Sequence, residues 1–184
     1  CKGTFKQDLD IFNCIPICEL SQIDNDKCVY GVLSKLNKLT VNAVGEGSMW
    51  VCNKNGNLIN GDYITSSTVT GYGVKQIVDA STLRNYTVGK ITCDCDFTLT
   101  KSIKKKVKYI DNINTNIDYD TNGDVQYIDD LNINGLQQQV YKYDTRFIDS
   151  SGNLLQDEAD YTSRLANSES VYVACFVGCT YHCG

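Results

Sequence analysis

The chain has 184 residues, of which 42% are hydrophobic and 21% are charged, and 17 basic against 22 acidic residues give a net charge of −5. This length fits one or two small domains. The acidic balance argues against a surface that neutralises nucleic-acid phosphates. The longest apolar stretch, Val171 to Cys179, has nine residues, about half of the roughly 20 that a transmembrane helix needs, so no membrane span is expected.

The ten cysteines form an even set, which predicts up to five disulfides whose pairing the sequence leaves open. We expect a hydrophobic core stapled by these bridges. Cys93 and Cys95 are two residues apart on an expected strand, so both are predicted to face one side and to pair with other cysteines. The full set is Cys1, Cys14, Cys18, Cys28, Cys52, Cys93, Cys95, Cys175, Cys179 and Cys183.

The first half of the chain predicts short strands separated by tight turns. Apolar and β-branched runs place strands at residues 28–33, 49–52, 63–65 and 86–92. Asn55-Gly56 and Asn60-Gly61 supply the positive φ angles that hairpin turns need.

The second half is predicted to begin at a basic run. Short strands are expected at residues 107–110, 116–119 and 125–128, a longer alternating strand at 140–148, a short helix near 157–165 capped by Asp157, and a buried strand at 171–177. The sequence therefore predicts a mostly β, antiparallel sandwich or barrel-like module, divided into domains 1–100 and 101–184. The basic run comprises Lys101, Lys104, Lys105, Lys106 and Lys108.

A family resemblance rests on two stretches. GEGSMWVCNKNGNLINGDYITSSTVTGYGVKQ and NYTVGKITCDCDF resemble C-terminal domains of fibre or appendage-like proteins from large DNA viruses. GDYITSS, GYGVKQ and TVGKI are more loosely similar to intramolecular-chaperone autoprocessing domains of tailed-phage appendage proteins. Gly61 is expected to allow a turn, Asp62 to bind local amides, and Gly71 and Gly73 to allow close backbone approach beside Tyr72.

The resemblance implies a structural module at the end of a virion fibre, spike or appendage. Such a module is expected to form a homotrimer, to contact an upstream fibre shaft or other virion proteins, and to lie on the virion surface or outside the cell. Its expected role is assembly or attachment, and no cofactor is predicted.

Self-cleavage is the first alternative function. The phage relatives cut their own chain at an acidic motif, and Asp8 and Asp10 lie in the corresponding region without the same pattern. Cys1 has three interpretations: a nucleophile released by self-cleavage, a lipid-modified terminus, or the first ordered residue of a longer protein. The last is favoured. No Ser/His/Asp or Cys/His set is evident, so repeated turnover is not expected.

The C-terminal cysteines have a second interpretation, a zinc site. Cys175, Cys179, His182 and Cys183 offer sulfur and imidazole ligands. Their C-x-x-x-C-x-x-H-C spacing is unusual for zinc, so disulfides are favoured and no metal is predicted.

A calcium loop is the corresponding interpretation of an acidic stretch. Oxygen ligands at alternate positions around a glycine bend are what such a loop requires. The flanking residues are typical of strands, so a hairpin that turns at Asn122-Gly123 is favoured over a calcium loop. The candidate ligands are Asp118, Asp120, Asn122, Asp124 and Asp129.

Two surface features complete the sequence predictions. Asn85-Tyr86-Thr87 is a glycosylation sequon, meaningful only in a secretory compartment. Trp50 and exposed tyrosines raise a third function, an extracellular adhesion module that binds a glycan or receptor, although a tryptophan more often belongs to the core.

Overall fold

A computed structural model describes residues 2–4, 17–34, 40–111, 116–121, 123–128 and 137–183. It is mostly β with antiparallel strand pairing, and α1 (Glu158–Ala166) is the α-helix, so the predicted fold class is confirmed. In the part of the chain described, no helix is long and apolar enough to span a membrane.

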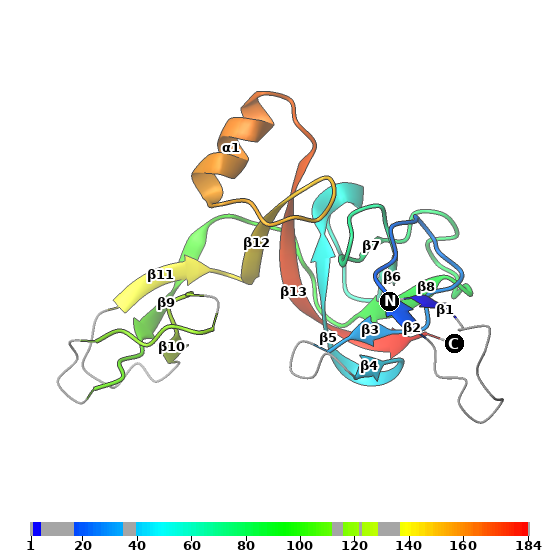
Figure 1. Cartoon of the computed structure of the whole chain (residues 1–184), viewed down its shortest axis with the longest axis horizontal. Helices are drawn as coiled ribbons and strands as arrows, with labels where there is room; N and C mark the ends of the chain where they lie inside the picture. Colours follow the sequence, from blue (N-terminus) through cyan, green and yellow to red (C-terminus); the bar gives the residue numbers. More distant parts are fainter. Residues whose placement is uncertain are drawn as a thin grey trace. The chain divides into compact units, whose positions relative to one another are not determined.

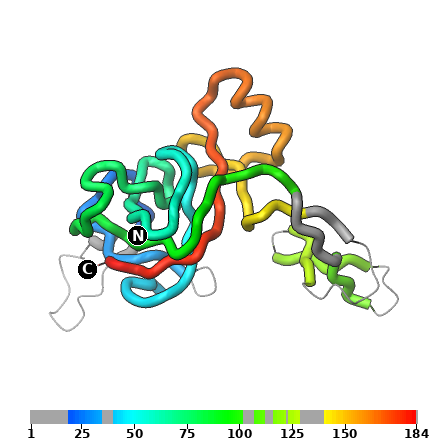
Figure 2. The backbone as a smooth tube through the Cα atoms, turned by 180° about the vertical axis from the view of Figure 1, so that it is seen from behind, coloured from blue at the N-terminus to red at the C-terminus, as the bar shows by residue number. Residues whose placement is uncertain are grey.

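The contacts divide the chain into two compact units, which differ from the predicted domains 1–100 and 101–184. One unit contains residues 1–97 and 143–184, and the other contains residues 98–142. Figure 2 shows the last strand, in red, alongside the cyan and green segments of the first unit. The predicted boundary near residue 100 lies at the start of the second unit, but the C-terminal 42 residues return to the first.

The long strand β13 (Val171–His182) is the centre of the first unit (Figure 1). One edge pairs with β5 (Val44–Cys52). The other edge pairs with β12 (Asp144–Asp149) at residues 171–176 and with β8 (Thr87–Ile91) at residues 179–181. A strand with neighbours on both sides is buried on the face that meets the core, and the odd-numbered side chains of β13 are all buried.

The sheet closes into a small barrel. From β8 it continues through β6 (Tyr63–Thr65) to β7 (Val74–Lys75). Just before β7, Gly73 forms a parallel bridge to Val51 of β5, with 2.9 Å hydrogen bonds from Cys52 N to Gly73 O and from Gly73 N to Trp50 O. The strand order is therefore β5-β13-β8-β6-β7 and back to β5.

Buried apolar side chains from several strands fill this barrel. Met49, Val51, Ile64, Ile91 and Val177 are each at most 3% exposed. A Cβ atom at Gly73 would lie 2.5 Å from Ile64 Cγ2, so glycine is what lets the closing strand approach. This confirms the close backbone approach that the sequence predicts at this position.

A second apolar cluster lies on the outer face of β13. Its five members pack together with Trp50, Tyr72 and Tyr172 partly buried against them. One member comes from β12, and the others come from β5, β7, β13 and the turn before β7. The cluster therefore packs β12 against the barrel. The members are Cys52, Val69, Val74, Ile148 and Ala174.

Polar residues of the GDYITSS and GYGVKQ motifs hold the barrel in shape. Gly61 has φ +98°, and the Asp62 carboxylate accepts the Ile59 amide at 2.8 Å, as predicted. Asp62 also pairs with Lys75 at 2.7 Å. These motifs therefore form the turn before β6, the strand β6 itself and its partner strand β7.

The remaining elements complete both units. Short pairs join β1 (Lys2–Thr4) to β2 (Ile17–Glu19) and β3 (Val32–Leu33) to β4 (Val41–Asn42), and η2 (Asn53–Asn55) is a 3₁₀ turn after β5. The second unit places β9 (Lys101–Val107) between β10 (Tyr127–Ile128) and β11 (Gln137–Tyr141).

Two local predictions have different outcomes. The helix is confirmed, with Asp157 accepting the Asp160 amide at 2.8 Å as its N-cap. The single strand expected at residues 140–148 is wrong, because the chain bends at Lys142 and Tyr143. Polar and apolar residues alternate in the sequence across this bend, but β11 belongs to one unit and β12 to the other.

Gln76 offers a test of the barrel's polar support. Its amide is 1% exposed, donates to the Asp79 and Thr82 carbonyls at 2.9 Å each, and accepts from Thr87 Oγ1 at 2.7 Å. Gln76→Leu should lower the free energy of unfolding by about 3 kcal/mol, because it removes three hydrogen bonds and leaves the buried Thr87 hydroxyl without its acceptor. Urea unfolding followed by Trp50 fluorescence measures this change. The exposed Gln156→Leu is the control and should shift stability by less than about 0.5 kcal/mol.

Candidate functional site

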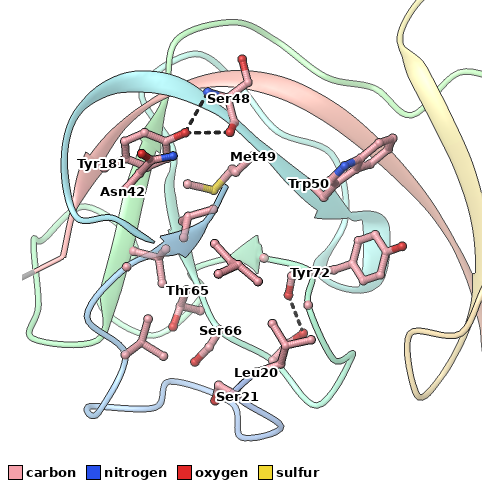
Figure 3. Close-up of a pocket in the computed structure, with 18 of the residues that line it drawn as sticks. Leu20, Ser21, Asn42, Ser48, Met49, Trp50, Thr65, Ser66, Tyr72 and Tyr181 are labelled. Atoms are coloured by element: carbon pink, nitrogen blue, oxygen red, sulfur yellow. Dashed lines mark hydrogen bonds between the residues drawn. The ribbon is translucent and has the colours of Figure 1, made fainter. Parts of the chain in front are cut away.

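A cavity of about 350 Å³ lies in the first unit, between the segment of residues 20–34 and the barrel. Figure 3 shows Met49 of β5 across the hollow from Leu20 and Ser21. Strands β3, β5, β6, β8 and β13 and the turn at residues 71–73 also contribute to its wall. Ligand pockets of proteins commonly start at about 300 Å³, so the cavity is large enough for a small molecule.

The segment of residues 20–34 is fastened to the barrel by polar groups. Asp26 accepts Ser21 Oγ at 2.6 Å and the Cys28 amide at 2.9 Å, and its own amide donates to Ser66 Oγ at 2.9 Å. Ser66 in turn donates to the Ile23 carbonyl at 2.9 Å. This serine of the GDYITSS motif therefore holds one wall of the cavity against the strand that carries it.

Tyr181 forms the opposite end of the cavity (Figure 3). Its hydroxyl donates to the Ser48 carbonyl at 2.8 Å and accepts the Ser48 amide at 3.1 Å. Burial raises the pKa of the Tyr181 hydroxyl, so it remains protonated and neutral at ordinary pH. A Cβ atom at Gly47 would collide with this ring, which explains glycine there.

Trp50 and Tyr72 lie together at another end of the cavity. Their ring centroids are 6.4 Å apart, and Phe176 lies 5.3 Å from Trp50. The Arg146 guanidinium carbon is 4.1 Å from the Trp50 centroid, so a cation already occupies one face of this ring.

The cysteines are thiols in the structure, so the predicted disulfide stapling is not supported for those described. Cys28 and Cys93 are exposed, whereas Cys52, Cys95, Cys175, Cys179 and Cys183 are buried. Cys1 and Cys14 lie outside the described residues, and so does the side chain of Cys18. The barrel is held by its own packing and hydrogen bonds.

The prediction that Cys93 and Cys95 share a face is wrong. The chain bends at residues 92 and 93 after β8, so Cys93 is exposed while Cys95 is fully buried. The Cys95 side chain is hydrogen-bonded to Cys175 of β13, and this contact together with burial raises the pKa of the Cys175 thiol. Burial raises the pKa of Cys52 and of Cys179 to about 11 each.

The four candidate zinc ligands do not converge. Alternation along β13 places Cys175 and Cys179 on one face and His182 on the other, where its ring nitrogen is 2.9 Å from Thr180 Oγ1. Cys183 follows the end of the strand. Residues four apart on a strand are about 13 Å apart, beyond the reach of one metal ion. Within the described ranges, no group of three or more His, Cys, Asp or Glu side chains is placed to hold a metal.

The candidate calcium stretch forms a hairpin in the second unit. Tyr119 and Val125 bridge in antiparallel fashion, the Gly123 amide donates to the Asp120 carbonyl at 3.0 Å, and Gly123 has φ +84°. Asp118 pairs with Lys108 at 2.6 Å, and Asp120 accepts the Asp124 amide at 3.0 Å. Asn122 and Asp129 lie outside the described residues.

The other predicted sites have mixed outcomes. Cys1, Asp8 and Asp10 lie outside the described residues. Asn85 is exposed, but the hydroxyl of Thr87, the third residue of its sequon, is buried and bonded to Gln76.

The cavity itself is what sequence reasoning missed. Its wall comes from segments between residues 20 and 181, and each segment taken alone is an ordinary strand or turn. The paired serines of GDYITSS were the available signal, since Ser66 and Ser67 both prove to be hydrogen-bonded at the cavity wall.

Thiol reactivity should follow burial. Brief alkylation with iodoacetamide near pH 8, followed by peptide mapping, should label Cys28 and Cys93 at least about tenfold faster than the five buried cysteines, because burial keeps the reagent from these thiols. Equal labelling, or a cross-linked peptide pair containing Cys95 and Cys175, would contradict the thiol assignment.

The buried thiols also predict a loss of stability at alkaline pH. In the unfolded chain a thiol ionises near pH 9, but Cys52 and Cys179 ionise near pH 11 when folded. Their contribution to the free energy of unfolding should be complete below about pH 8. It should decline as the pH rises toward 11, because the thiols of the unfolded state lose their protons first. Urea midpoints between pH 7 and pH 11 measure this decline. Cys52→Ala should reduce the slope, and the exposed Cys28→Ala should not.

No protein family model, curated protein or solved structure matches the chain. Its function is therefore inferred from three features of its own: the motif-built barrel, the cavity beside it and the apolar side chains that the barrel's loops expose.

Proposed function

We propose that the chain is a non-catalytic structural module of a virion fibre, spike or appendage, which forms a homotrimer and supports assembly or attachment on the virion surface. The motifs that resemble such proteins support this proposal, because their residues define the barrel itself. Turn-forming or strand-closing contacts are made by Asp62, Ser67, Gly73 and Gln76, and Ser66 holds the segment of residues 20–34 against the barrel. The resemblance therefore covers the part of the chain that determines its shape.

The observation that carries the proposal is the loop between β7 and β8. Gln76 holds this loop from within, and Arg84 pairs with Asp79 at 2.9 Å. Nevertheless, Ile77, Val78 and Leu83 are 63%, 57% and 51% exposed. An ordered loop that presents large apolar side chains to water is typical of a surface that packs against another subunit.

Two alternatives use other residues. A self-cleaving chaperone domain would depend on Cys1, Asp8 or Asp10, none of which the structure describes. A glycan-binding adhesion module would depend on Trp50, whose ring is half-buried and lies under Arg146. The exposed apolar loop favours subunit contact over either of them.

Oligomeric state tests the proposal. Light scattering coupled to size-exclusion chromatography should give the mass of a trimer for the full chain, and the double variant Ile77→Asp, Val78→Asp should give a monomer, because six carboxylates would meet in the trimer interface.

Leu154→Asp is the matched control, since this leucine is 62% exposed outside the loop. It should leave the trimer intact. A wild-type chain that remains monomeric at high concentration, or a double variant that still forms trimers, would overturn the proposal.

A further inference from the structure

We propose that the cavity beside the barrel is a binding site for a neutral, apolar small molecule. This inference goes beyond the structural role and does not depend on trimer formation. It rests on the charge of the wall, on the polar atoms that the wall has already paired, and on the position of the single tryptophan.

The wall favours a neutral ligand. None of the described residues that line the cavity is Asp, Glu, Lys, Arg or His. The neighbouring carboxylate of Asp26 already accepts Ser21 and the Cys28 amide. An ionic group brought into such a site would lose its hydration without gaining a partner of opposite charge, which costs far more than an apolar contact returns.

The wall also favours an apolar ligand, because four of its hydroxyl groups already donate hydrogen bonds within the chain. Ser21 donates to Asp26, Ser67 donates to the Tyr72 carbonyl at 3.2 Å, and Tyr181 donates to the Ser48 carbonyl. Thr65 donates to the Tyr86 carbonyl at 3.1 Å. Much of the remaining wall is apolar and can contact a ligand through carbon atoms. These atoms belong to side chains such as Leu20, Val29, Val32, Leu33, Met49 and Phe176.

The cavity is built before any ligand arrives. The Ser66 bonds fix the segment of residues 20–34, and the Tyr181 bonds fix β13 against β5. A preformed apolar site binds without first ordering its own side chains, so the free energy of apolar burial is retained as affinity.

A matched pair of fluorescent probes tests the ligand class. N-phenyl-1-naphthylamine is neutral, and 1-anilinonaphthalene-8-sulfonate has the same ring system with one added sulfonate. Trp50 is the single tryptophan and lines the cavity, so a bound probe should quench its emission by energy transfer. The neutral probe should saturate this signal at one molecule per chain, with an affinity at least about tenfold higher than that of the sulfonate.

Leu20→Asp tests the location. Leu20 is 44% exposed, so a carboxylate there can remain hydrated when the cavity is empty but lies at the wall when it is filled. The variant should weaken binding of the neutral probe at least about tenfold. Leu154→Asp, the same change at a leucine away from the cavity, should bind as the wild type does. Leu33→Asp repeats the test on another wall residue should Leu20→Asp not fold, as judged by circular dichroism.

Three results would overturn the proposal. They are the absence of saturable binding of the neutral probe, equal affinity for the two probes, and unchanged binding in a folded Leu20→Asp or Leu33→Asp variant. Trimer formation is measured separately, so failure of this site and failure of the structural role can be distinguished.

Discussion

The closure of the barrel between Gly73 and β5 is the constraint on which the rest of the first unit depends. Two 2.9 Å backbone hydrogen bonds join Gly73 to Trp50 and Cys52, and they pair the end of β5 with the segment that leads into β7. Closure requires the closing strand to pass against Ile64, where a side chain larger than hydrogen at position 73 would collide. One glycine and its two hydrogen bonds thus determine whether β6 and β7 form a wall of the barrel or an open hairpin.

The cavity is a consequence of this closure together with the serine-rich end of β6. The segment of residues 20–34 packs against the closed barrel and shares the cavity wall with Met49 and Tyr181. Asp26 and Ser66 hold that segment through polar contacts instead of complete apolar packing. The hollow between the two surfaces therefore has carbon walls with paired polar groups, the usual composition of a small-molecule site.

The cysteines show why sequence spacing alone is a weak guide to cysteine chemistry. Four residues at the C-terminus have the donors of a zinc site, but they lie on an extended strand, which spreads them over two faces and a long distance. Cys93 and Cys95 are two residues apart, which on a strand would place them on one face. A bend after β8 instead leaves Cys93 exposed and Cys95 buried. Cys95 then meets Cys175, some 80 positions away in the chain, because β13 returns to the barrel.

The sequence by itself determined the local elements, because these follow from short-range physics. Alternating β-branched residues and an aspartate cap specify strands and the helix without reference to distant residues. Gly56 and Gly61 do adopt the positive φ angles expected of Asn-Gly turns, but the strands on either side of them, β5 and β6, pair with other strands and form no hairpin. Only the tertiary structure decided that residues 143–184 join the first unit, that the strand expected at 140–148 divides between units, and where the cavity lies. These features depend on pairings such as Trp50 with Phe176 and Ser66 with Asp26, which join residues tens of positions apart. Such pairings follow from how the whole sheet closes, and no single segment carries that information.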